Sequence, residues 1–102
     1  MRVFIVSPLP GTKDYDIDAV KVQENRLIRV GHKPLSLRRY DFDEETSIEV
    51  MNRKVLENIL EADGIMLMDE SNETNGGTLP RLIAAALGIP EVKVTVLGTK
   101  WV

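Results

Sequence analysis

The sequence predicts an α/β fold in which a four-stranded parallel sheet lies between two layers of helices, as in flavodoxin-like or Rossmann-like proteins. Short apolar runs alternate along the chain with longer segments whose apolar residues recur at helical spacing. This alternation implies parallel strands joined by right-handed crossovers, and we expect the strand order 2-1-3-4. The chain of 102 residues suits a single domain that spans residues 1–102.

The first part of the chain predicts two strands joined by a helix. Residues 2–6 form a short apolar and β-branched run, which is typical of a buried strand. Residues 16–30 show helical spacing of apolar side chains, and Gly31 directly after them is a suitable residue to end a helix. Residues 34–37 are expected to form the second strand, and residues 38–45 a polar loop.

The second helix has a clear signal at its start. Thr46 and Glu49 have the spacing of a capping box, in which each residue satisfies a free backbone N–H of the other. Apolar residues continue at helical spacing until about Ala62. The third helix is expected to begin at Thr78, with Pro80 in its first turn, and to end at Gly88.

Two further apolar runs predict the remaining strands. Residues 65–68 are expected to form the third strand and residues 92–97 the fourth. Residues 98–102 are interpreted as a short tail, in which Trp101 is available to pack on a neighbouring subunit.

Composition excludes several classes of function. The net charge of -3, with dispersed cations, argues against nucleic acid as the main partner, since phosphate contacts need a basic surface. The chain has no cysteine and a single histidine, His32, which argues against a transition-metal site and a serine-histidine-acid triad. No apolar run approaches the roughly 20 residues of a membrane span. We expect no metal, no cofactor and no membrane.

The candidate ligand site lies where the predicted strand order reverses, between the first and third strands. The loops after these two strands meet at one crevice, and the start of the third helix adds unpaired N–H groups. Asp69 and Glu70 could accept hydrogen bonds from sugar hydroxyls or act as nucleophile or base, or they could be solvated loop charges. The candidate ligand-binding residues are Ser7, Pro8, Leu9, Thr12, Asn72, Asn75, Gly76, Gly77 and Thr78.

The whole chain resembles the nucleoside 2-deoxyribosyltransferase-like superfamily, and in particular small members common in phages and prophages. The resemblance is carried by the order and spacing of short pieces. They are Ser7 and Pro8 after the first strand, Gly31 and His32 after the first helix, Ala62 and Asp63 after the second, Gly77 and Thr78 before the third, and residues 88–90 after it. The resemblance implies the same α/β fold.

The resemblance also implies an activity, the cleavage of the N-glycosidic bond of deoxynucleosides or deoxynucleotides by a glutamate nucleophile. The position of that glutamate is Arg81 here, and the position of a second family carboxylate is Val55. Neither residue can stabilise an oxocarbenium-like transition state as a carboxylate does. Arg81 would instead suit a phosphate in the crevice, or it could point to solvent or pair with Glu70 or Glu73.

Three hypotheses remain open. The first is a catalytically degenerate protein that binds a nucleotide or nucleoside, with Arg81 added to the ligand-binding residues. The second is an active N-glycosidase or deoxyribosyltransferase that uses Asp69 or Glu70. The third is an interaction module without a small ligand. The resemblance further implies a homo-oligomer, a dimer or larger. The absence of cysteine fits a protein of the cytoplasm, which would be that of the bacterial host cell if a phage encodes the chain.

Overall fold

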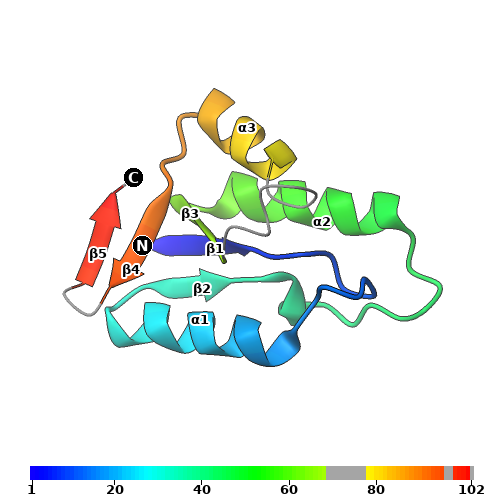
Figure 1. Cartoon of the computed structure of the whole chain (residues 1–102). Coiled ribbons are helices and arrows are strands. Elements are labelled where there is room, and N and C mark those ends of the chain that lie inside the picture. Colours follow the sequence, from blue (N-terminus) through cyan, green and yellow to red (C-terminus); the bar gives the residue numbers. More distant parts are fainter. Residues whose placement is uncertain (69–77, 96–97, 102) are drawn as a thin grey trace.

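The computed structural model describes residues 1–68, 78–95 and 98–101. It shows an α/β domain in which α1 covers one face of a central sheet while α2 and α3 cover the other (Figure 1). The elements are β1 (Arg2–Val6), α1 (Ile17–Arg29), β2 (Lys33–Leu35), the 3-10 helix η1 (Leu37–Arg39), α2 (Ile48–Glu61), β3 (Gly64–Leu67), α3 (Thr78–Ala86), β4 (Val92–Thr95) and β5 (Gly98–Trp101).

The central sheet has three parallel strands in the order β2-β1-β3, so the first three positions of the predicted order are correct. Phe4 in the middle strand lies between Leu35 of β2 and Ile65 of β3. A central strand buried on both faces needs apolar residues at consecutive positions, and the residues of β1 after Arg2 are all buried. The carboxyl ends of β1 and β3 therefore lie side by side.

The prediction of a fourth parallel strand is wrong. Glu91, directly before β4, makes one isolated parallel bridge with Ile65 of β3, and the Ile65 N–H donates to the Pro90 carbonyl at 2.9 Å. β4 itself pairs antiparallel with β5, a segment that was expected to be a tail. Gly98 adopts a φ of 121°, which L side chains rarely adopt, and so allows the chain to return beside β4.

Helix boundaries follow local signals, with one correction. Asp16 caps α1 by accepting from the N–H groups of Asp18 and Ala19, and Gly31 ends it at a φ of 90°. The cap of α2 is Ser47, whose hydroxyl accepts from Val50 N–H, and not Thr46. The Thr46 hydroxyl instead closes the preceding turn with Asp43.

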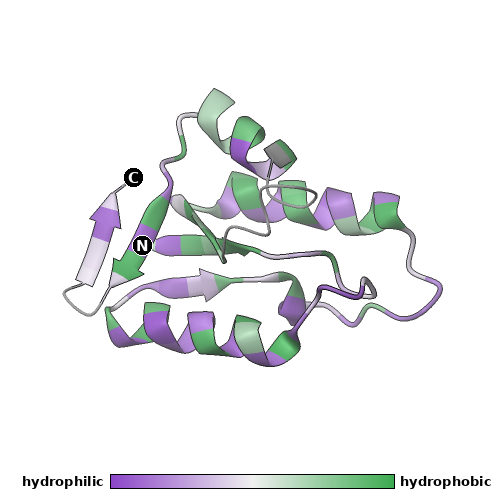
Figure 2. Ribbon diagram, viewed as in Figure 1, coloured by the Kyte–Doolittle hydropathy of each residue, from purple (hydrophilic) through white to green (hydrophobic). Residues whose placement is uncertain are grey.

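Apolar side chains fill the space on both faces of the sheet (Figure 2). The larger cluster packs β1 and β3 against α2 and α3, with Phe4, Ile59 and Ala84 among its buried members. The smaller cluster packs β1, β3 and β4 against α1 around Leu27.

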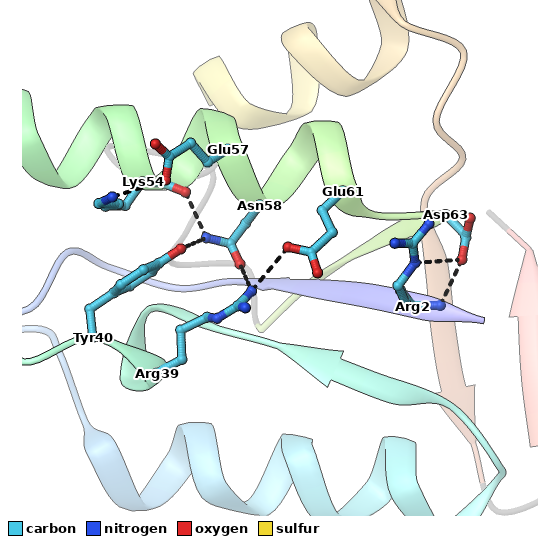
Figure 3. Close-up of polar contacts among 8 residues, drawn as sticks. All are labelled: Arg2, Arg39, Tyr40, Lys54, Glu57, Asn58, Glu61 and Asp63. Carbon is cyan, nitrogen blue, oxygen red and sulfur yellow. Dashed lines mark hydrogen bonds and ion pairs between the residues drawn. The ribbon is translucent and has the colours of Figure 1, made fainter.

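A polar network fixes the segment after β2 to α2 (Figure 3). Asn58 of α2 is fully buried and donates to the Tyr40 hydroxyl at 2.8 Å and to the Lys54 carbonyl at 2.6 Å. Its carbonyl oxygen accepts from Arg39, which also pairs with Glu61 at 3.2 Å. The network holds the segment that follows β2 against α2, the helix that lines the candidate site.

His32 joins the end of α1 to the hairpin of β4 and β5. Its Nε2 lies 2.6 Å from the Thr99 hydroxyl, and its Nδ1 lies 3.2 Å from the Met1 amino nitrogen. Burial and the neighbouring ammonium both hold the pKa of His32 below its usual value. The side chain therefore links the hairpin to the domain.

Candidate functional site

A cavity of about 250 Å³ opens at the carboxyl end of β1, between α2 and α3. The end of a central parallel strand is where open α/β sheets place ligands, because backbone groups and loops converge there. The apolar lining residues are Phe4, Val6, Leu9, Ile48, Val55, Leu56, Leu79, Pro80 and Ile83.

Two polar residues, Ser7 and Asn52, complete the described lining. The Ser7 hydroxyl donates to the Pro8 carbonyl at 3.0 Å, so its oxygen lone pairs are available to a ligand donor. The Asn52 amide makes no hydrogen bond with another described residue and can both donate and accept. An apolar cavity with two neutral polar groups suits a flat, uncharged ligand that carries a few hydroxyl or amine groups.

The structure brings several predicted site residues to this cavity. Ser7 and Leu9 line it, and Pro8 lies between them, partly buried. Thr12 instead closes the turn after β1, where its hydroxyl donates to the Leu9 carbonyl at 2.7 Å. Thr78 begins α3, directly before the lining residues Leu79 and Pro80.

The predicted residues between β3 and α3 lie outside the described residues. They are Asp69, Glu70, Asn72, Asn75, Gly76 and Gly77. Their roles stay predictions.

Arg81 lines a different cavity from Ser7. Its Nε and Nη2 atoms donate to one carboxylate oxygen of Glu91 at 3.1 and 2.9 Å, which ties the first turn of α3 to the residue before β4. Glu91 comes close to Arg81 through the fold and not through chain spacing, so it differs from the expected partners Glu70 and Glu73. The Arg81 guanidinium thus has a partner within the domain.

Val55 lines the cavity. Its buried isopropyl group contributes to the apolar wall and has no group that could orient a sugar or a base. Among the described lining residues, no side chain is a carboxylate or a histidine. The described lining therefore supplies neither a carboxylate nor an imidazole for acid-base chemistry.

Sequence reasoning missed the contribution of α2. Ile48, Asn52 and Leu56 are spaced by four residues and form a stripe beside the core stripe that contains Val55. Ile48 and Leu56 are 60% and 42% exposed, so their apolar side chains serve the cavity more than the core. The signal that could have identified this side of the cavity is the pair of apolar residues Ile48 and Leu56, which lie outside the buried face of α2.

An ion pair on the α1 side orders the backbone after β2, away from the cavity lining. Arg38 Nη2 donates to Glu24 at 2.7 Å, and the Ser36 hydroxyl donates to the same carboxylate at 2.7 Å. Burial alone would raise the pKa of Glu24, but these hydrogen bonds outweigh it and leave the pKa below its usual value. Burial raises the pKa of nearby Tyr15. This cluster is consistent with a structural role.

Within the residues described, no group of three histidine or acidic side chains is arranged to hold a metal ion. Over the same residues, none of the helices combines the length and apolarity needed to cross a membrane.

Comparison with known proteins gives one structural relative to report. No family model matches the sequence, and no curated protein is significantly similar to it. A solved structure of a 2-deoxyribosyltransferase from the psychrotolerant bacterium Bacillus psychrosaccharolyticus superposes with a TM-score of 0.64 at 20% sequence identity. The match covers 89% of this chain and 69% of that one. The comparison shows that this chain has the same fold as that 2-deoxyribosyltransferase.

Proposed function

We propose that this protein binds a nucleoside in the cavity at the end of β1. The observation that carries the proposal is the composition of that cavity, in which apolar walls face the two neutral polar side chains Ser7 and Asn52. A nucleobase is flat and packs well on aliphatic walls, whereas a sugar needs hydrogen-bond partners such as these. The shared fold with a 2-deoxyribosyltransferase, a biocatalyst for nucleoside synthesis, supports the choice of ligand class.

The proposal favours a nucleoside over a nucleotide. A volume of about 250 Å³ is slightly below the roughly 300 Å³ at which typical small-molecule pockets begin. The described lining carries no cation to neutralise a phosphate, and Arg81 is paired with Glu91 outside this cavity. A neutral ligand therefore fits the described residues better than a charged one.

We also propose that the protein holds its ligand without cleaving it. Val55 and Arg81 occupy the positions at which the resemblance places carboxylates. Retaining cleavage of a glycosidic bond needs a carboxylate nucleophile, which the described lining does not supply. Release of free base from a bound deoxynucleoside would instead support the enzyme hypothesis and direct attention to Asp69 and Glu70.

Binding is expected to disappear when the cavity is filled from α2. Leu56→Trp places an indole ring at the cavity wall and should weaken nucleoside binding by about tenfold or more, since a ligand of this size needs most of the volume. Isothermal titration calorimetry with a panel of deoxynucleosides and their monophosphates measures this effect.

The matched control for this experiment is Val50→Trp, on the same helix but outside the cavity lining, which should leave affinity unchanged. Equal affinity in the two variants would contradict the assigned cavity. Absence of binding across the panel in the unmodified protein would refute the proposal.

We further propose that the chain forms a homo-oligomer through α2 and α3. Leu60 of α2 and Leu82 of α3 are 64% and 61% exposed, and these helices pack on each other. Large exposed apolar side chains on adjacent helices mark association surfaces. Sedimentation velocity should show a dimer or larger species that shifts to monomer in Leu60→Glu combined with Leu82→Glu. A monomeric unmodified protein at high concentration would rule this out.

A further inference from the structure

A second cavity, of about 270 Å³, lies on the opposite face of the sheet, between α1 and β4. Its lining comes mainly from α1, from the end of β3 and the residue after it, and from β4. The lining also includes Leu67 of β3 and Arg81 of α3, but the two cavities share no lining residue.

The wall formed by the sheet is apolar and adaptable. Met66 and Met68 from the end of β3 and Val94 from β4 line the cavity and belong to, or pack against, the smaller apolar cluster. Thioether side chains are flexible and polarisable, so they conform to ligands of different shape. This wall suits an apolar ring or short chain.

The rim on α1 is cationic. Arg26 lines the cavity, and Arg29, one turn later, lines an adjoining hollow that shares Arg26 and Val94. Neither arginine has an ion pair or hydrogen bond with any other described residue. The helix dipole accounts for cations in the last turn of α1, but it does not account for the apolar side chains Met66, Met68 and Val94 that line the cavity beside Arg26.

The side of the cavity formed near β4 carries no free negative charge, among the described residues, that would neutralise the arginines of α1. Glu91 lines the cavity, but its carboxylate already pairs with Arg81 at 2.9 Å. On a chain with a net charge of -3, this cavity is thus bordered by two guanidinium groups that have no partner among the described residues. Guanidinium groups one helical turn apart can bind the same phosphate through several charge-assisted hydrogen bonds.

We propose that the cavity between α1 and β4 binds a small organic phosphate. Its apolar body lies against Met66, Met68 and Val94, and its phosphate pairs with Arg26 and Arg29. The site is distinct from the nucleoside cavity in both position and chemistry, because one is neutral and the other cationic. The protein would then hold two ligands on the two faces of one sheet.

Titration calorimetry with naphthyl phosphate tests this proposal, with naphthol and inorganic phosphate as the separate halves of the probe. Naphthyl phosphate should bind more tightly than either half, and its affinity should fall as salt is added, because exposed charges are screened. The double variant Arg26→Gln and Arg29→Gln should weaken binding by about tenfold or more. Arg53→Gln, an exposed arginine of α2, is the matched control and should have no effect.

Leu56→Trp separates this proposal from the proposed function, since it blocks the nucleoside cavity and should leave naphthyl phosphate binding unchanged. Circular dichroism confirms that each variant folds. Loss of naphthyl phosphate binding in Leu56→Trp, or full binding in the double arginine variant, would overturn the second site. So would equal affinity for naphthol and naphthyl phosphate.

Discussion

Replacing Asn58 with alanine is expected to lower the free energy of unfolding by about 2–4 kcal/mol. Asn58 is fully buried in α2, and its amide group makes hydrogen bonds to the Tyr40 hydroxyl, the Lys54 carbonyl and the Arg39 guanidinium (Figure 3). Alanine removes all three contacts and leaves their partners without this amide. Because unsatisfied polar groups keep their desolvation cost, the loss exceeds that of a single exposed hydrogen bond.

Urea denaturation followed by circular dichroism measures this loss. Asn52→Ala is the matched control, since Asn52 lies on the same helix, is exposed and makes no hydrogen bond with another described residue, and it should change stability by less than about 0.5 kcal/mol. Tyr40→Phe removes one hydrogen bond of the network and should cost about 1 kcal/mol. Equal stabilities of the Asn58 and Asn52 variants would show that the network contributes no stability.

Replacing Phe4 with alanine is expected to have the largest effect on stability, a loss of about 3–5 kcal/mol. Phe4 lies in the central strand, is 1% exposed and belongs to the larger apolar cluster. Strands on both sides and helices above it limit how far the structure can collapse into the space left by the ring. A domain with a total stability of about 5–15 kcal/mol would lose a large share of it.

Thermal unfolding by calorimetry, or urea denaturation if heating is irreversible, measures this change. Phe4→Leu keeps most of the apolar volume and should cost clearly less than Phe4→Ala, which separates cavity formation from the loss of the aromatic ring. Since Phe4 also lines the nucleoside cavity, Phe4→Leu should alter nucleoside affinity in a protein that remains folded. A loss below about 1 kcal/mol for Phe4→Ala would mean that this part of the core repacks freely.

Local chemistry explains why most elements could be predicted. The cap at Asp16, the positive φ of Gly31 and the start of α3 at Thr78 depend on residues close together in the chain. The order of the first three strands follows from alternating strands and helices, because right-handed crossovers leave few arrangements. The cap of α2 was predicted one residue too early because Thr46 and Ser47 both carry a hydroxyl. The Thr46 hydroxyl donates to Asp43 in the preceding turn, so Ser47 caps the helix.

The candidate site was predictable only in part. Ser7 and Leu9 follow the central strand, so topology alone placed them at its carboxyl end, where they line the cavity. The wall from α2 was not anticipated, since Asn52 and Leu56 have the spacing of ordinary helix surface positions. Their role depends on the angle at which α2 and α3 pack, which is set by side chains from both helices.

The sequence by itself determined the α/β class, the positions of the helices and the order β2-β1-β3, because these follow from periodicity, caps and chain connectivity. The tertiary structure alone decided that β4 leaves the parallel sheet to pair with β5, and that Arg81 pairs with Glu91 away from Ser7. Pairing at a sheet edge and contacts between separate elements depend on which surfaces meet in space. Such contacts leave no mark on the spacing of residues within either segment.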